Sequence, residues 1–314
     1  MQDSPNGFDT PMLGLETEEW LVKLEEIAEE HGFFQPLGDA HFATFVEEKP
    51  TLLVTFESID DIQARRDTGQ PLGFELVREL GWSHLCILSK GQSWFRDPAV
   101  YAFFDRMADD GFFDEFENVL FFGTGPCGYA AAAFSVAAPG ARVVALNPQA
   151  TLTPEIAGWD ERFAGVRKMS FTDRYGYAPD MLDAAEKAFI FYYRSFTKDA
   201  MHAALFRSPN VELIGLPWFG APLEKSFLDM QILYRILVQA GVGKLTRHGV
   251  FQLMRTRRDH GPYLRALLGR LQKNDRVLLT ALLCANVTSR MKAPRFSRTL
   301  SKLEKAAVEG RLAG

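Results

Sequence analysis

Cysteine is scarce in this sequence, and its spacing excludes several classes of protein. The 314 residues contain three cysteines, Cys86, Cys127 and Cys284, and no two of them form a CxxC pair. An odd and dispersed set disfavours both a disulfide framework and a zinc site. We therefore expect no bound metal, and we expect the protein to act in the cytoplasm.

Leader-like and membrane-spanning segments are also missing from the sequence. The first residues are polar and interrupted by prolines, so we expect no secretory signal and interpret residues 1–14 as a flexible tail. The most apolar stretch, Tyr129 to Ala138, is too short to cross a bilayer. Neither a GxxxxGK[ST] phosphate loop nor an HExxH zinc helix occurs. We expect no membrane association and no cofactor.

Charge is distributed unevenly along the chain. The net charge is −5, yet residues 241–314 hold 16 Lys and Arg against 4 Asp and Glu. A basic region of this kind can bind an anionic partner, or it can dock on the acidic remainder of the chain, and the sequence leaves both open. Aromatic residues are sparse among its arginines, which disfavours nucleic acid as the partner.

Apolar runs alternate with amphipathic helical patterns over residues 15–240. The strand-like runs stand at residues 51–57, 84–89, 118–123, 142–147, 187–193 and 211–217. This alternation predicts a three-layer α/β/α sandwich around a mostly parallel sheet. Residues 41–47 and 51–57 are interpreted as an antiparallel hairpin that leads into it. Residues 241–314 show helical patterns only, which predicts an all-helical C-terminal region.

The loop after the 118–123 strand carries the most informative motif. It reads Gly123-Thr124-Gly125-Pro126-Cys127-Gly128-Tyr129-Ala130-Ala131. As GxGxxG, it matches the fingerprint whose glycines let a pyrophosphate approach a helix N-terminus. That fingerprint also expects an acidic residue after the next strand, which here ends in Asn147-Pro148-Gln149. Dinucleotide binding through Gly123, Gly125 and Gly128 is therefore our third hypothesis.

The same residues resemble the GxSxGGYAA nucleophile elbow of α/β-hydrolases. In particular, they are similar to a bacterial subgroup whose next strand ends in a Pro-Gln step, here Pro148-Gln149. The resemblance covers roughly residues 40–240 and implies a sheet of α/β-hydrolase type. It further implies a sharp strand-to-helix turn whose apex is flanked by Gly123, Thr124, Pro126 and Gly128.

The resemblance places the catalytic positions on residues that cannot carry out acyl transfer. The nucleophilic serine falls on Gly125, and the donor of the oxyanion N–H falls on Pro126, which has no N–H. The acid falls on Asp199, and the histidine falls on Ala221. We therefore expect a degenerate triad. Our first hypothesis is a non-catalytic binding or accessory protein that holds a small molecule in the old active-site cleft.

A second hypothesis retains an enzyme with a different nucleophile. Cys127 lies at the start of the helix, where the helix dipole lowers the pKa of a thiol. Asp199 and His202 are spaced by three residues and share one helical face, so they could supply the acid and the base. This set would act on an ester, thioester or similar acyl group.

Overall fold

The structure is a computed structural model that describes residues 8, 10–48, 50–166, 168–219 and 222–309. The chain forms two compact units. Unit 1 comprises Met1–Pro217 and Pro222–Leu253, and unit 2 comprises Trp218–Ala221 and Met254–Gly314. The division thus falls within the region that the sequence marks as helical from residue 241 onwards, and each unit is described by itself below.

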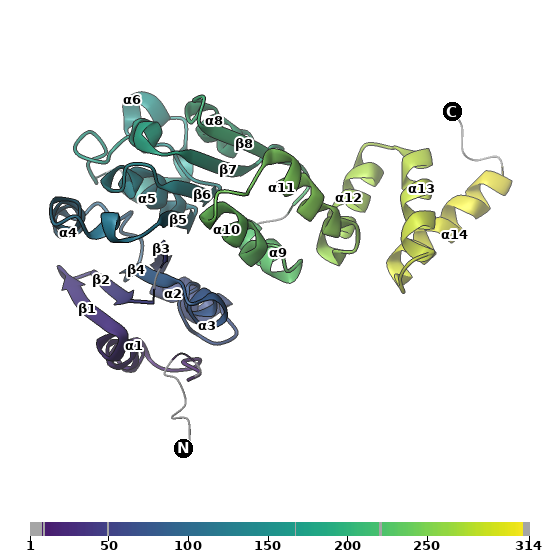
Figure 1. Ribbon diagram of the computed structural model, residues 1–314. Coiled ribbons are helices and arrows are strands. Elements are labelled where there is room, and N and C mark those ends of the chain that lie inside the picture. Colours follow the sequence, from purple (N-terminus) through teal and green to yellow (C-terminus); the bar gives the residue numbers. More distant parts are fainter. Residues whose placement is uncertain (1–7, 9, 49, 167, 220–221, 310–314) are drawn as a thin grey trace, which may run out of the picture. The chain divides into compact units, whose positions relative to one another are not determined.

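Unit 1 is built on one sheet. Its described strands are β1 (Gly32–Leu37), β2 (His41–Val46), β3 (Thr51–Ser58), β4 (Ser83–Ser89), β5 (Asn118–Thr124), β6 (Arg142–Leu146), β7 (Lys187–Tyr193) and β8 (Val211–Leu216). They are ordered β1-β2-β4-β3-β5-β6-β7-β8. β2 runs antiparallel to its neighbours β1 and β4, and the pairs from β4 to β8 are parallel. This topology is of α/β-hydrolase type and confirms the predicted fold class (Figure 1).

Helices connect the parallel strands. Those of unit 1 are α1 (Thr17–His31), α2 (Ile59–Arg65), α3 (Phe74–Leu80), α4 (Pro98–Asp109), α5 (Pro126–Phe134), α6 (Pro154–Ala157), α7 (Ala178–Met181), α8 (Thr197–Leu205), α9 (Leu223–Asp229), α10 (Leu233–Gly241) and α11 (Arg247–Leu253). The start of α4 follows the predicted rules, because the Asp97 carboxylate accepts a hydrogen bond from the Ala99 N–H at 2.8 Å. Pro98 occupies the first helical position, where its missing N–H costs nothing.

The sheet is buried on both faces, as the apolar strand sequences require. Successive residues of β4 point in opposite directions, so Leu85 and Ile87 join one core cluster while Cys86 and Leu88 join another. The first cluster contains residues of α4 and α5, and the second contains residues of α1, α2 and α3. Helices therefore cover the two faces and form the three-layer sandwich.

The predicted hairpin between residues 41–47 and 51–57 is wrong. β2 pairs with β1 and with β4, whereas β3 lies between β4 and β5. The β1 sequence, GFFQPL, does not predict a strand, because glycine and proline are both uncommon in strands. Pro36 is tolerated there because β1 is the edge strand of the sheet, where one backbone N–H can be spared.

The predicted flexible tail also needs correction. Residues 1–7 and 9 lie outside the described residues, but Phe8 and Met12 are buried in the core cluster beside α1. The Met12 N–H donates to the Thr68 carbonyl at 2.8 Å, and the Gln70 side chain donates to the Phe8 carbonyl at 2.7 Å. The segment is polar overall, but two apolar side chains, those of Phe8 and Met12, attach it to the sandwich.

Unit 2 consists of helices, as predicted for the C-terminal region. After a short 3-10 turn at Met254–Arg258 come α12 (Gly261–Lys273), α13 (Val277–Thr288) and α14 (Pro294–Val308). Their core contains Leu264, Leu268, Cys284, Val287 and Phe296. Over the described residues of both units, none of the helices combines the length and apolarity that crossing a membrane requires.

Candidate functional site

The turn between β5 and α5 has the shape that the motif predicts. β5 ends at Thr124, α5 begins at Pro126, and Gly125 between them has φ 56° and ψ −122°. A side chain would be strained in this conformation, and glycine adopts it freely. Among the described residues, no atom lies within 4 Å of where a Cβ of Gly125 would stand. The apex of the turn thus faces open space but presents no side chain to it.

The two flanking glycines are explained by packing rather than by a phosphate. A Cβ on Gly123 would overlap the backbone carbonyl of Cys127, and one on Gly128 would come within 3.1 Å of the Gly123 carbonyl oxygen. Helix α5 therefore lies directly against β5, and only glycine permits this approach. Pro126 at the helix start supplies no N–H to an anion. The geometry thus accounts for the GxGxxG spacing without a dinucleotide.

A small pocket lies beside this turn at the carboxyl ends of β3 and β5. The chain crosses from β3 to β4 on one side, while β5 and its successors extend the sheet on the other side. Ligands of open α/β sheets bind at such switch points. The residues that line the pocket are Phe56, Glu57, Ser58, Asp61, Ile62, Arg66, Phe122, Thr124, Cys127 and Glu224.

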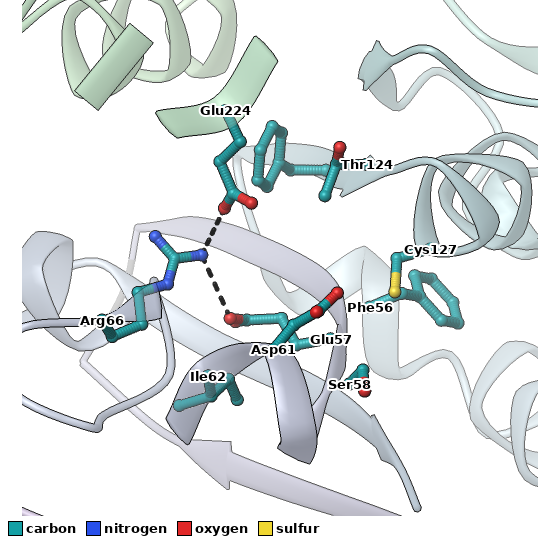
Figure 2. A pocket seen from close by; sticks show the side chains of 10 residues that line it. Phe56, Glu57, Ser58, Asp61, Ile62, Arg66, Thr124, Cys127 and Glu224 are labelled. Atoms are coloured by element: carbon teal, nitrogen blue, oxygen red, sulfur yellow. Dashed lines mark hydrogen bonds and ion pairs between the residues drawn. The ribbon is translucent and has the colours of Figure 1, made fainter. Parts of the chain in front are cut away.

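One arginine paired with two glutamates lines the pocket. The Nη2 group of Arg66 lies 2.5 Å from Oε1 of Glu224 and 3.4 Å from Oε2 of Glu57 (Figure 2). Glu57 is the next-to-last residue of β3, Arg66 directly follows α2, and Glu224 stands in the first turn of α9. All three side chains are largely buried, with exposed fractions of 6%, 11% and 8%. A single guanidinium therefore compensates two buried carboxylates.

Burial and the opposite charges of neighbouring side chains shift the pKa values of this cluster in opposite directions. Burial raises the pKa of Glu57, and the nearby guanidinium of Arg66 offsets part of that shift. Burial also disfavours the charged form of Arg66, but Glu224 and Glu57 outweigh this effect and raise its pKa. The Glu57 carboxylate further accepts hydrogen bonds from the Leu72 N–H at 3.0 Å and the Thr55 hydroxyl at 2.9 Å. These donors stabilise the ionised carboxylate and offset part of the effect of burial.

The space that remains in the pocket is about 20 Å³. A cavity of this size holds roughly one water molecule. This pocket therefore has little free volume, since the Arg66 side chain and its two carboxylate partners line it. A pyrophosphate group does not fit in this pocket.

Potential metal donors lie next to this cluster. Donor atoms of Glu57, His84 and Cys86 lie within 4.8 Å of one another, and all three side chains are buried. The Thr55 hydroxyl stands among them, donating to Glu57 at 2.9 Å and lying 2.8 Å from His84 Nε2. Since its proton goes to Glu57, the hydroxyl must accept from the His84 Nε2–H. Burial lowers the pKa of His84 to about 3, which keeps the ring neutral. We interpret the group as a hydrogen-bonded network rather than a metal site.

The structure does not assemble the alternative catalytic set predicted from the sequence. Cys127 lines the pocket and is 6% exposed. The imidazole of His202 is used elsewhere: its Nδ1 accepts from the Ala150 N–H at 3.2 Å, and its Nε2 lies 3.0 Å from Asp160 Oδ2. Asp199 pairs with Arg162 at 2.7 Å, not with His202. The predicted relay from Asp199 through His202 to Cys127 is therefore absent from these contacts.

His202 and Asp160 belong to a closed ionic network in the loops after β6 and β7. The guanidinium of Arg162 binds both oxygens of Asp160, at 2.9 Å and 2.7 Å. Burial disfavours the Asp160 carboxylate, but hydrogen bonds from Arg162 and His202 outweigh it and lower its pKa to about 2. Burial lowers the pKa of His202 to about 4. The neutral ring with its proton on Nε2 is thus a structural donor, not a free base.

The position that the resemblance assigns to the triad histidine, Ala221, lies outside the described residues. Glu224, three residues later, is the charged group from that part of the chain that reaches the pocket. The sequence patterns did not single out Glu57, Arg66 and Glu224. One signal for Glu57 was present, because an acidic residue ends an otherwise apolar strand, TLLVTFE. Nothing in the sequence marks Arg66 as its partner.

Comparisons with known proteins place the chain among distant structural neighbours only. No protein-family model and no curated protein matches the sequence. A capsule O-acetyltransferase of Neisseria meningitidis serogroup A is 10% identical, with a TM-score of 0.43 over 66% of this chain and 94% of that one. Est1E from Butyrivibrio proteoclasticus is 14% identical, with a TM-score of 0.40 over 64% and 98%. A Pyrobaculum calidifontis esterase is 15% identical, with a TM-score of 0.42 over 71% and 92%. The fold class itself rests on the strand order of the chain.

Proposed function

We propose that this chain is a strongly diverged α/β-hydrolase-like protein with a binding or accessory role and without serine-hydrolase chemistry. The observation that carries the proposal is Gly125 at the apex of the β5–α5 turn, with φ 56° and ψ −122°. A nucleophile elbow holds its serine in such a strained turn, so the turn is kept here while the reactive group is gone.

Two further features support the loss of acyl transfer. Pro126 follows the apex and has no N–H to stabilise an oxyanion. Beside the turn, the pocket contains a salt-bridged Arg66 and has room for about one water, with a volume of about 20 Å³. A substrate acyl group meets no serine at the apex and little free volume in the pocket beside it, so we assign the binding role to the surface of the protein rather than to this pocket.

A serine-reactive probe tests the proposal directly. The folded chain should release p-nitrophenol from p-nitrophenyl acetate no faster than the heat-unfolded chain at the same concentration. A fluorophosphonate probe should label no residue above that background. Specific labelling that maps to one serine of the folded protein would overturn the proposal.

A cysteine enzyme is the second candidate, favoured by the position of Cys127. This residue stands in the first turn of α5 and lines the pocket beside Thr124 and Glu57. A thiolate there would receive support from the helix N-terminus. The nearby carboxylates of Glu57 and Glu224 would oppose that charge, which is why we rank this function second. Its test is the alkylation experiment described in the Discussion.

A further inference from the structure

Basic residues form a stripe along helix α14 of unit 2. Residues 254–314 contain 14 Lys and Arg against 4 Asp and Glu. Four of the basic residues stand on α14 and are exposed, namely Arg295, Arg298, Lys302 and Lys305. Their spacings of three, four and three residues place them on one face of the helix. At a rise of 1.5 Å per residue, this basic stripe is about 15 Å long.

The basic stripe lies on the outer side of α14. The helix packs beside α13 (Figure 1), with Phe296 buried in the core of the unit and Leu300 packed against that core. Helical periodicity places both apolar residues on the side opposite the stripe. Glu304 lies off the stripe and lines the groove between α13 and α14, and Glu309 follows the last residue of the helix. The face of α14 that carries the stripe is therefore basic over its length.

Further basic residues stand beside the start of α14. Arg290, after the end of α13, donates to the Arg258 carbonyl oxygen at 3.0 Å and pairs with Asp259. This contact brings the arginine-rich turn Met254–Arg258 next to the segment that leads into α14, where Lys292 is exposed. Among the described carboxylates of unit 2, that of Asp259 is engaged by Arg290, and none forms an ion pair with the stripe. The charges of the stripe therefore remain for an external anion.

We propose that the basic stripe binds the phosphate backbone of a nucleic-acid duplex without sequence preference. A duplex carries one negative charge per about 1.7 Å of its axis, and Lys and Arg that neutralise phosphates release condensed counterions. The scarcity of aromatic residues argues against stacking on unpaired bases, but contacts to the phosphates of a duplex need no aromatic side chain. The proposal names a partner for the binding role above and rests on unit 2 alone, so duplex binding can fail while the loss of hydrolase chemistry in unit 1 stands.

Two other anionic partners match the stripe less well. A bilayer surface binds helices that combine cations with apolar side chains on one interfacial surface. In unit 2, the exposed Leu278 and Leu279 line a groove together with Leu300, on the side of α14 opposite the stripe. An acidic protein surface would need apolar or aromatic anchors at the centre of the contact, and the stripe provides none. Charge alone supplies most of the affinity for a phosphate backbone, which is why the duplex is favoured.

The experiment measures binding of the full chain to a fluorescein-labelled 20-base-pair DNA duplex of mixed sequence. Fluorescence anisotropy should show binding at 50 mM salt that weakens roughly a hundredfold by 200 mM, as expected when about four phosphates are neutralised. A second duplex of unrelated sequence should bind within about twofold of the first. Replacement of all four stripe residues by glutamine should weaken binding at 50 mM salt by at least about tenfold.

Single substitutions sharpen the test. Lys302→Gln should reduce the slope of log affinity against log salt by about 1. Lys225→Gln is the matched control, because it removes the same charge from a 68% exposed position on α9 and should leave the slope unchanged. Circular dichroism checks that each variant is folded, and Lys302→Gln decides the question if the fourfold variant does not fold.

Three outcomes would overturn the proposal. The first is an absence of duplex binding at 50 mM salt. The second is an affinity and a salt slope that the stripe substitutions leave unchanged. The third is stripe-dependent binding to phosphatidylserine vesicles or to polyglutamate without binding to the duplex, which would assign the stripe to a membrane surface or to an acidic protein.

Discussion

Two buried ionic clusters at the carboxyl ends of the strands differ in how their charges are balanced. In the pocket beside Gly125, one guanidinium, that of Arg66, serves two carboxylates, those of Glu57 and Glu224. In the segments that follow β6 and β7, Arg162 likewise pairs with two carboxylates, those of Asp160 and Asp199, but Asp160 also lies 3.0 Å from His202 Nε2 and 3.7 Å from the Lys198 ammonium. Burial raises the pKa of Glu57 and also that of Asp199, whereas the hydrogen bonds to Asp160 lower its pKa to about 2.

This difference separates a cluster that lines the pocket beside Gly125 from one that links the segments after β6 and β7. A carboxylate with surplus donors is stable in its charged form and stabilises the fold at neutral pH. A carboxylate that shares its only cation with a second carboxylate loses its charge compensation when that cation is removed. The shape of the pocket around it depends on the same cation. We therefore expect removal of the central arginine to destabilise the protein more in the Arg66 cluster than in the Arg162 cluster, and the stability predictions test that contrast.

Removal of Arg66 should have the largest effect. Arg66→Ala leaves Glu57 and Glu224 buried without their cation, and we expect the free energy of unfolding to fall by about 3–5 kcal/mol. Arg162→Ala is the matched comparison: Asp199 loses its pairing with Arg162, but Asp160 keeps His202 and Lys198, and the 28% exposure of Arg162 lets water reach the vacated position. We expect that variant to lose about 2 kcal/mol. Urea unfolding at pH 7 measures both values.

The pH dependence of Arg66→Ala tests whether buried carboxylates without a cation cause the loss of stability. Without the guanidinium, the raised pKa of Glu57 rises further, so the folded state gains stability as the pH falls and Glu57 takes up a proton. The loss caused by Arg66→Ala should therefore shrink between pH 7 and pH 5. A loss that is constant over this range, or one that Arg162→Ala exceeds, would contradict the contrast between the clusters.

Much of the fold could be predicted from local sequence, but this cluster could not. The six strand-like runs contain β3 to β8 because buried parallel strands are continuous apolar segments. The turn at Gly125 was also predictable, because tight packing of α5 on β5 demands glycines at a fixed spacing. Arg66 and Glu224 are separated by 158 residues, and their pairing exists only once the sheet has brought α2 and α9 together.

His202 illustrates the opposite difficulty. Its spacing from Asp199 gave a plausible acid–base pair, yet the ring turns to Asp160, a residue in a loop after another strand. Helical spacing predicts which residues share a face but not which loop packs against that face. The candidate base was therefore assigned to the correct helix and the wrong partner.

The second prediction concerns stability in acid. The pKa of His202 falls to about 4 in the folded protein, from an ordinary value of 6.5. A group with a lowered folded pKa stabilises the protein above its unfolded pKa, and this contribution is lost as the pH falls from 6.5 towards 4. It amounts to about 2 kcal/mol between pH 6.5 and pH 5.

His202→Gln isolates this contribution, because glutamine can accept from the Ala150 N–H and donate to Asp160 without titrating. The loss of unfolding free energy between pH 6.5 and pH 5 should be about 2 kcal/mol smaller in this variant than in the unmodified chain. An identical pH dependence would mean that His202 is not held neutral, and the second cluster would then be no better balanced than the first.

The third prediction concerns Cys127, which belongs to the pocket. If it is a packed side chain, iodoacetamide at neutral pH should modify it at least about tenfold more slowly in the folded chain than in urea, as expected for a thiol that reacts only after opening. Cys86 and Cys284 are both buried and serve as internal references, read by mass spectrometry of peptides. Modification of Cys127 well ahead of both references would favour the cysteine enzyme over the binding protein.

The smallest effect is expected at the apex of the turn. Gly125→Ser places a side chain at φ 56°, which costs about 1 kcal/mol of stability, but no described atom obstructs it. The serine should not become a nucleophile, because His202 is engaged with Asp160 and Pro126 supplies no oxyanion N–H. Hydrolysis of p-nitrophenyl acetate should therefore stay at the level of the unmodified chain.

Gly125→Ala is the control, since it carries the same backbone strain without a hydroxyl. Both variants should unfold at the same urea concentration, within about 0.5 kcal/mol. Esterase activity in Gly125→Ser alone would show that a base and an oxyanion donor are already in place, and the pocket would then be a dormant active site rather than a filled one.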